Sequence, residues 1–194
     1  MHGHIGQSGY VTYPRGCCCC CIWYISSAVN TFLTDAFFFM HPACTQDEVN
    51  IMFDRAKVAQ KSWAKTPLWK RAELLKVAAS LMRDHAAPIS ACLIKEVAKP
   101  AKDSHAEVIR SADLLDYTAE EGVRVLGQGK LLNSDSFPGN GRNKLCLVSK
   151  VPLGIVLAIP PFNYPVNLAV SKIGPALMAG NAVILKPPSQ VREP

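Results

Sequence analysis

Two polar residues stand at the ends of apolar segments in the C-terminal part of the sequence. Asn163 lies in a proline-flanked turn within "AIPPFNYPVN", and Lys186 ends the apolar run "AVILK" in front of two prolines. A neutral amide can donate hydrogen bonds to an oxygen that becomes negative only in a transition state. A lysine ammonium at a strand end can hold a ribose or a phosphate. These residue types therefore suit oxyanion stabilisation and nucleotide binding.

Each of the two residues also has a purely structural explanation. An asparagine in a turn frequently bonds its own backbone, and for Asn163 taken alone this is the more common role. A lysine at the end of a strand is commonly a solvated charge, which is the corresponding explanation for Lys186. A functional interpretation therefore depends on the elements that bring the two residues together.

The hydrophobic pattern around these residues predicts a strand, a helix and a second strand. Short apolar strands are expected over residues 155–159 and 182–186, with a helix over about 165–179 and a Gly-Asn stop between them. Such a unit places the two strands parallel in one sheet. Because ligands bind at the carboxyl ends of parallel strands, we expect Asn163 and Lys186 to face one crevice.

Four helices are expected before any strand. Thr45 and Glu48 form a capping box in front of an apolar series, and Thr66 is the expected N-cap of the next helix, with Pro67 at its first position. Two more segments, "APISACLIKEVAK" and "AKDSHAEVIRSADLLDYTAEEGVRVL", keep a helical period. A Gly, Asn and Pro cluster at 138–143 then separates two extended runs and predicts a long hairpin. This order indicates an α/β fold with a helical layer, a hairpin and an incomplete Rossmann-like parallel sheet.

The composition is that of a folding chain with scattered charge. The 194 residues are 49% hydrophobic and 19% charged, and 21 Lys and Arg stand against 15 Asp and Glu, for a net charge of +6. The basic residues do not gather in a stripe, so no nucleic-acid partner is predicted. The balance suits an enzyme of anionic metabolites or dinucleotides, among other classes.

The eight cysteines do not predict a metal site. Five are consecutive, from Cys17 to Cys21, and adjacent cysteines lack the spacing with which two thiolates reach one zinc ion. The other three, Cys44, Cys92 and Cys146, are isolated. We expect them to be small buried apolar residues in a reducing compartment.

The apolar segment 17–40 is nearly as long as a bilayer-spanning helix, which needs about 20 residues. Polar residues interrupt it, and a charge such as that of Asp35 costs about 2.5 to 3.5 kcal/mol within a span. A membrane partner is therefore not favoured. Residues 1–43 are interpreted as a segment foreign to the fold that follows, with poor order or loose packing.

The longest motif resembles a known enzyme family. "GIVLAIPPFNYPVNLAVSKIGPALMAGNAVILKPPSQ" is similar to the segment of the aldehyde dehydrogenase superfamily that carries its Pro-aromatic-Asn and Lys-Pro motifs. The stretches "KVAQKSWAKTPLWKRAELL", "KEVAKPAKD", "AEEGVRVLG" and "SDSFPGN" resemble its branch of plant non-phosphorylating, NADP-dependent glyceraldehyde-3-phosphate dehydrogenases. The resemblance covers about residues 44–190.

The resemblance implies roles for individual residues. Asn163 corresponds to the asparagine whose amide helps to form the oxyanion hole, and with Arg110 and Tyr164 it belongs to the site for the phosphorylated aldehyde. An arginine suits this task because its planar fork can hold two phosphate oxygens. The implied NADP contacts lie at the strand ends and in the turn that follows the first strand: Ile159, Pro161, Phe162, Lys186 and Ser189. Ser189 leaves room for the 2′-phosphate of NADP, whereas a carboxylate there would repel it.

The resemblance also implies how the chain is divided into parts and where the protein acts. Residues 44–123 correspond to the helical part of the cofactor-binding domain, 124–152 to a hairpin of the oligomerisation type, and 153–194 to an incomplete dinucleotide-binding unit. The family implies a homo-oligomer in the cytoplasm that acts in glycolysis on a phosphorylated aldehyde.

Several parts of the family's machinery have no counterpart in this sequence. The glycine-rich cofactor loop, the glutamate that activates water and the nucleophilic cysteine correspond to positions beyond residue 194. Covalent oxidation of an aldehyde needs a thiolate to attack the carbonyl carbon. We therefore expect an N-terminal fragment that has no aldehyde dehydrogenase activity by itself. The alternative interpretation is a non-catalytic module, truncated or membrane-associated.

Overall fold

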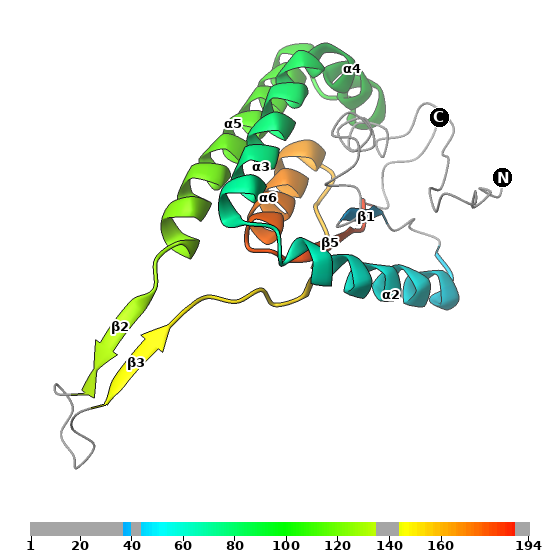
Figure 1. Ribbon diagram of the computed structural model, residues 1–194. Helices are drawn as coiled ribbons and strands as arrows, with labels where there is room; N and C mark the ends of the chain where they lie inside the picture. The colour runs from blue at the N-terminus through cyan, green and yellow to red at the C-terminus, as the bar shows by residue number, and fades with distance from the viewer. Residues whose placement is uncertain (1–36, 40–43, 135–143, 189–194) are drawn as a thin grey trace.

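The computed structural model describes residues 37–39, 44–134 and 144–188 (Figure 1). The elements follow one another as β1 (Phe37–Phe39), α2 (Gln46–Trp63), α3 (Leu68–Asp84), α4 (Ala86–Val97), α5 (Ala101–Leu126), β2 (Lys130–Asn133), β3 (Leu145–Val148), β4 (Ile155–Ala158), α6 (Pro165–Met178) and β5 (Ala182–Leu185). Helices, a hairpin and a parallel sheet in this order confirm the predicted α/β class.

Helix α2 begins at the predicted capping box. The Thr45 hydroxyl oxygen accepts from the Glu48 backbone N–H, and the Glu48 carboxylate accepts from the Thr45 backbone N–H at 2.8 Å. Two donors at the start of α2 are thereby satisfied by local residues alone. This is why four residues of sequence predict where the helix begins.

The start of α3 differs from the prediction by one residue. Pro67, and not Thr66, is the N-cap, because the backbone of Pro67 is extended with ψ at 145° and α3 begins at Leu68. The Thr66 side chain makes no capping hydrogen bond. Its carbonyl oxygen instead accepts from Nη1 of the buried Arg71 at 3.0 Å, which holds the turn between α2 and α3.

The helices α3, α4 and α5 form a layer around one apolar core. Ala72, Leu75, Ala79 and Met82 recur at helical spacing along α3 and are buried, whereas Leu68 is only partly buried. The long helix α5 packs along both α3 and α6. Since full burial of a Leu or Met side chain contributes about 1.5 to 3 kcal/mol, this core is the main stabilising feature of the helical layer.

The parallel sheet has the order β1-β5-β4, and both pairs of neighbours are parallel. The predicted strand, helix and strand are present as β4, α6 and β5. The prediction that four helices precede any strand is wrong, because β1 comes before α2 and pairs with β5, with Phe38 opposite Ile184. A run of three phenylalanines has no alternating pattern, so the pairing with a distant segment had no local signal.

Helices cover both faces of the central strand β5. Val183 and Leu185 belong to the main core on the side of α6, whereas Ala182 and Ile184 pack with Ala56 of α2. Successive side chains of a strand point to opposite faces, so a strand covered on both sides is apolar throughout. All four residues of β5 are buried, which explains the uninterrupted run "AVIL".

The antiparallel hairpin of β2 and β3 extends away from the helices (Figure 1). This arrangement confirms the predicted hairpin, although its turn at 138–143 lies outside the described residues. Every residue of both strands is exposed. Cys146 on β3 is therefore exposed, contrary to the expectation of a buried cysteine, while Cys44 and Cys92 are half-buried; Cys92 and Cys146 are free thiols.

Within the described part of the chain, no helix is both long and apolar enough to cross a membrane. Most of the apolar segment 17–40 lies outside the described residues, and the same holds for the start of the chain.

Candidate functional site

The segment between β4 and α6 is a turn held at the surface. It starts where β4 ends at the buried Ala158, and Pro161, Phe162, Asn163 and Tyr164 are exposed. Pro165 occupies the first position of α6, where a missing N–H costs nothing, and this fixes the point at which the chain becomes helical. The Asn163 side chain therefore lies directly in front of α6, as the sequence predicted.

Three residues of the predicted substrate site come together here. The guanidinium carbon of Arg110, on α5, lies 5.9 Å from the centre of the Tyr164 ring, and Tyr164 follows Asn163 directly. Arg110 is exposed, and in the described part of the chain the Tyr164 ring is its one recorded partner. A guanidinium without a carboxylate beside it keeps its charge and donors available for an anion.

A second cation, Lys99, lies on the same ring but is already paired. Its Nζ is 3.5 Å from the centre of the Tyr164 ring, 2.5 Å from Oε2 of Glu107 and 3.2 Å from the carbonyl oxygen of Asn163. The Glu107 carboxylate compensates the lysine charge. For Arg110, by contrast, the described residues show no ion pair.

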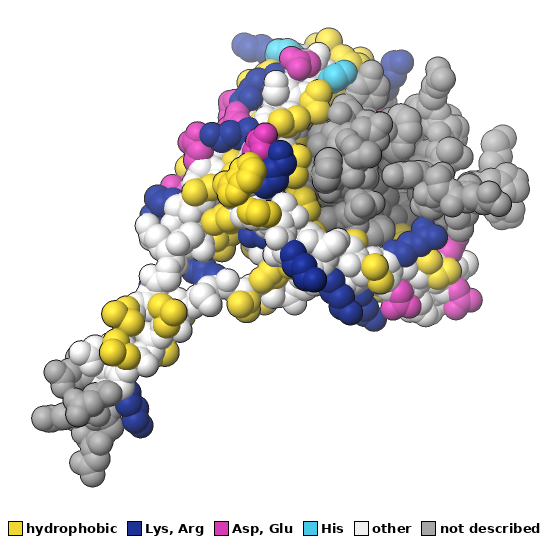
Figure 2. All heavy atoms as spheres, viewed as in Figure 1, with side chains coloured by type: hydrophobic (Ala, Val, Ile, Leu, Met, Phe, Trp, Pro, Cys, Tyr) yellow, Lys and Arg dark blue, Asp and Glu magenta, His cyan; other side chains and the backbone are white. Residues whose placement is uncertain are grey.

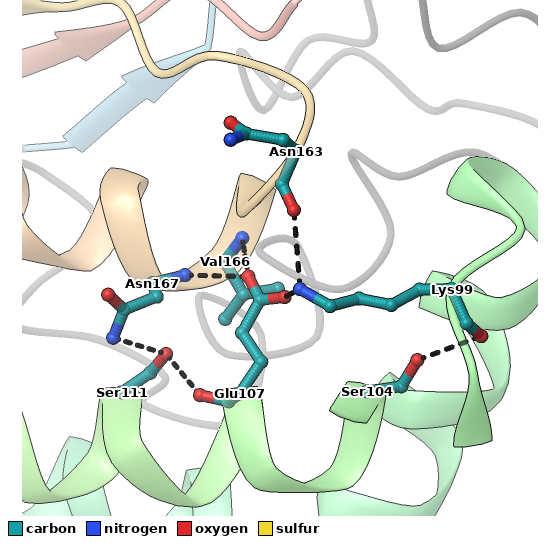
Figure 3. A network of polar contacts seen from close by, with 7 residues as sticks. All are labelled: Lys99, Ser104, Glu107, Ser111, Asn163, Val166 and Asn167. Carbon is teal, nitrogen blue, oxygen red and sulfur yellow. Dashed lines mark hydrogen bonds and ion pairs between the residues drawn. The ribbon is translucent and has the colours of Figure 1, made fainter. Parts of the chain in front are cut away.

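Figure 3 shows how this network is arranged around the start of α6. Lys99 enters from the loop between α4 and α5, Glu107 rises from α5, and the carbonyl of Asn163 points toward the lysine. The side-chain amide of Asn163 points away from the network. The amide of Asn163 is thus free of the ion pair while its backbone is bound to it.

A cleft of about 290 Å³ adjoins the turn and is lined by Val97, Ala98, Lys99, Pro100, Phe162, Asn163 and Tyr164. It brings the loop that follows α4 against the turn that precedes α6. A larger hollow of about 500 Å³ lies on α3 and α5, beside Trp69 and Val77, and none of the residues with implied roles lines it. The smaller cleft is the candidate site because it contains the amide and the aromatic ring.

Lys186 lies at the carboxyl end of β5, next to the end of β4. Its backbone N–H donates to the carbonyl oxygen of Ala158 at 2.9 Å, so the two strand ends are joined at this edge. Its Nζ is 3.4 Å from the Pro187 carbonyl oxygen, and no ion pair is recorded for it among the described residues. A half-buried ammonium with one long hydrogen bond suits an anionic ligand such as a nucleotide.

The predicted crevice is confirmed only in part. Asn163 and Lys186 do follow the carboxyl ends of neighbouring parallel strands, but Lys186 is not among the residues that line the cleft. Of the other implied cofactor contacts, Ile159, Pro161 and Phe162 are exposed in the turn, and Ser189 lies outside the described residues. The site thus has two parts, one around Asn163 and one at Lys186.

Sequence reasoning missed Lys99 and Glu107. Glu107 is fully buried, and it lies on the face of α5 that also buries Val108, Ser111 and Leu115. The helical period places residue 107 on that apolar face, and a carboxylate there must find partners. This conflict between charge and burial was the available signal.

The fold and the site define an enzyme class, and comparison with known proteins agrees. A family model described as "Aldehyde dehydrogenase family" matches residues 27–192, so the chain belongs to the aldehyde dehydrogenase family. The match includes β1 and extends the resemblance past the predicted limits of residues 44 and 190.

Within this family, the chain is similar to NADP-dependent glyceraldehyde-3-phosphate dehydrogenases. The chain is 74% identical over 148 residues to the NADP-dependent glyceraldehyde-3-phosphate dehydrogenase of Triticum aestivum, covering 76% of this chain and 30% of that protein. Against the enzyme of the same name from Streptococcus equinus it is 48% identical over 149 residues, covering 77% of this chain and 31% of that protein. The chain therefore spans less than a third of the length of these curated relatives.

An enzyme of the same name is also found among the solved structures that are similar to this chain. The NADP-dependent glyceraldehyde-3-phosphate dehydrogenase of Bacillus halodurans C-125, complexed with NADP, has a TM-score of 0.72 and 46% identity, covering 77% of this chain and 31% of that one. The described elements are thus those of one part of an aldehyde dehydrogenase fold.

Proposed function

We propose that the complete protein oxidises glyceraldehyde 3-phosphate with NADP, and that this chain supplies part of the substrate site and part of the cofactor site. The observation that carries the proposal is the exposed guanidinium of Arg110 beside Tyr164 and Asn163, for which the described residues show no ion pair. A site of this kind suits a substrate with an aldehyde at one end and a phosphate at the other. The names of the wheat and bacterial relatives support the same substrate and cofactor.

Each residue has a defined task in this proposal. The Arg110 guanidinium binds two phosphate oxygens in a bidentate pair, with the Tyr164 ring fixing its plane. The Asn163 amide would donate to the aldehyde oxygen as it becomes negative, when the nucleophilic cysteine that the family resemblance places beyond residue 194 adds to the carbonyl carbon; this lowers the barrier because the donor is already in place. Lys186 binds the ribose and 2′-phosphate end of NADP. NADP, when bound, accepts the hydride.

The test uses a hybrid enzyme, in which the matching part of this chain is joined to the remainder of the wheat enzyme. The measurement is NADPH formation. Arg110→Ala is expected to raise KM for glyceraldehyde 3-phosphate about ten- to one-hundredfold, since a hydrogen bond to a charged group contributes about 1.5 to 3 kcal/mol. KM for unphosphorylated glyceraldehyde should not change. Arg124→Ala on the same helix is the matched control, because Arg124 is exposed and paired with Glu121. An equal effect of Arg110→Ala on both substrates would refute the assignment.

We also propose that the complete protein is a homo-oligomer that uses the β2–β3 hairpin. Leu131 and Leu147 are directly opposite in the register, and they are 70% and 78% exposed. Figure 2 shows apolar side chains along this hairpin beyond the body of the molecule. Burial of such a surface against a second copy would remove it from water and cover the unpaired strand edges.

A cytoplasmic location, in glycolysis, is part of the proposal. Two free cysteines in the described residues, Cys92 and Cys146, are compatible with a reducing compartment.

A further inference from the structure

Helix α6 begins without a side-chain cap from its own segment. Its N-cap is Tyr164, which offers no capping hydrogen bond, and Pro165 has no backbone N–H. The next two backbone donors, those of Val166 and Asn167, point at Glu107 on α5, whose Oε1 accepts from them at 3.0 and 3.1 Å. A carboxylate at this position also interacts favourably with the helix dipole. A residue remote in sequence therefore caps α6.

Lys99 extends this contact to the residues in front of the helix. Its ammonium has three donors, and it binds Oε2 of Glu107 while also donating to the carbonyl oxygen of Asn163. The lysine side chain is 11% exposed and that of Glu107 is 0% exposed, so water competes little for either group. The backbone of Asn163 is thus held by Lys99 on one side and by the capped helix on the other.

Neighbouring hydroxyls bind the backbone of both paired residues. The Ser104 hydroxyl donates to the carbonyl oxygen of Lys99 at 3.3 Å, and the Ser111 hydroxyl donates to that of Glu107 at 2.7 Å. The Asn167 amide nitrogen donates to the Ser111 hydroxyl at 3.3 Å, which ties α6 to α5 a second time (Figure 3).

We propose that Lys99 and Glu107 are positioning residues that set the orientation of the Asn163 amide and of the Tyr164 ring. The inference rests on the proposed function, because it assigns an effect on the reaction to residues that touch the backbone of the site and not its substrate. A cap for α6 requires Glu107 alone. The contacts of Lys99 with the Asn163 carbonyl and the Tyr164 ring are not needed to cap the helix, so they favour a role in placing the two side chains.

The kinetic test uses the hybrid enzyme with the double variant Lys99→Met and Glu107→Gln. The double variant leaves no buried charge without a partner, and the glutamine oxygen can still accept from the start of α6, so the melting temperature should stay close to that of the parent. The expected result is a fall in kcat of about tenfold or more, because small misplacements of reacting groups are costly. KM for NADP should change less than kcat, because Lys186 lies outside the cleft and of the implied cofactor contacts only Phe162 lines it.

The matched control is the double variant Lys76→Met and Glu120→Gln. Lys76 on α3 and Glu120 on α5 form an ion pair at 3.3 Å outside the cleft, so its removal should leave kcat unchanged. A double variant with parental kcat would overturn the proposal. A fall in kcat together with the melting temperature would do the same, because a general structural role would then explain the loss.

A second readout does not depend on activity. In the 194-residue chain, the ε-methylene protons of Lys99 should show an upfield NMR shift from the Tyr164 ring, since Nζ lies 3.5 Å from its centre. Glu107→Gln should remove this shift if the carboxylate holds the lysine in place, and persistence of the shift would overturn the proposal. An inactive parent hybrid would refute the proposed function and leave this measurement as the test of positioning.

Discussion

Gly122 and Met178 meet where α5 crosses α6, and a Cβ added at Gly122 would lie 2.2 Å from Cγ of Met178. Met178 is 1% exposed, so its side chain has little space into which it can turn. We expect Gly122→Ala to destabilise the chain by about 1 to 2 kcal/mol, because overpacking outweighs the better helix propensity of alanine. Urea unfolding of the full chain measures this change.

Gly129→Ala is the control for this prediction. An added Cβ there would have its nearest neighbour, the Val148 carbonyl oxygen, at 3.5 Å, which is an ordinary contact. Its stability should lie within about 0.5 kcal/mol of the parent. A Gly122→Ala variant as stable as this control would contradict close packing of the two helices.

Ala98 is in the left-handed region, with φ at 52° and ψ at 34°, where α4 ends and the cleft begins. This conformation costs an L-residue about 1 to 2 kcal/mol and costs glycine almost nothing. Ala98→Gly is therefore expected to raise the stability by about 0.5 to 1 kcal/mol after the larger entropy of the unfolded glycine chain is subtracted. Thermal unfolding checks it. Ala91→Gly, at an exposed position inside α4, should have the opposite sign, and a loss of stability in both variants would refute the prediction.

The sequence predicted those elements whose signals are local. The capping box of Thr45 and Glu48, the helical period of α5 and the strand, helix and strand around α6 are each specified by neighbouring residues. The strand Phe37–Phe39 was not predicted, because only its pairing with β5 defines it. At Thr66 the expected capping role is absent for a local reason, because the backbone of Pro67 takes the N-cap position and Arg71, five residues further on, binds the Thr66 carbonyl oxygen.

In the candidate site, too, some residues were predicted from local sequence motifs and others depend on contacts between distant segments. Asn163, Arg110 and Tyr164 were predicted through motifs, and the structure brings them together at the start of α6. Lys99 and Glu107 were not, because the acceptors and donors that they bind belong to Asn163, Val166 and Asn167, far away in sequence. A buried glutamate on an apolar helix face signals that a partner exists and does not say which one.

The cofactor preference gives a prediction at the second part of the site. Ser189, beyond the described residues, follows Lys186 by three positions. In the hybrid enzyme Ser189→Glu should weaken NADP binding by about 1.5 to 3 kcal/mol relative to NAD, because a carboxylate replaces a donor to the 2′-phosphate. Apparent binding constants for both cofactors measure the difference. Equal effects on NADP and NAD would show that residue 189 does not contact the 2′-phosphate.

The hairpin gives the last prediction. Both of its faces are apolar, since Leu131 and Leu147 lie opposite each other and Leu132 lies opposite Cys146 in the next pair. If two copies associate through this surface, a charge placed on it must be either buried or left between the subunits, and both are unfavourable. Leu147→Lys in the full chain should therefore shift the mass measured by sedimentation toward that of a monomer, without a change in the helical signal by circular dichroism. Val58→Lys on α2 is the matched control, because Val58 is 72% exposed and far from the hairpin along the chain. An oligomer that survives Leu147→Lys and is lost in Val58→Lys would place the interface on α2.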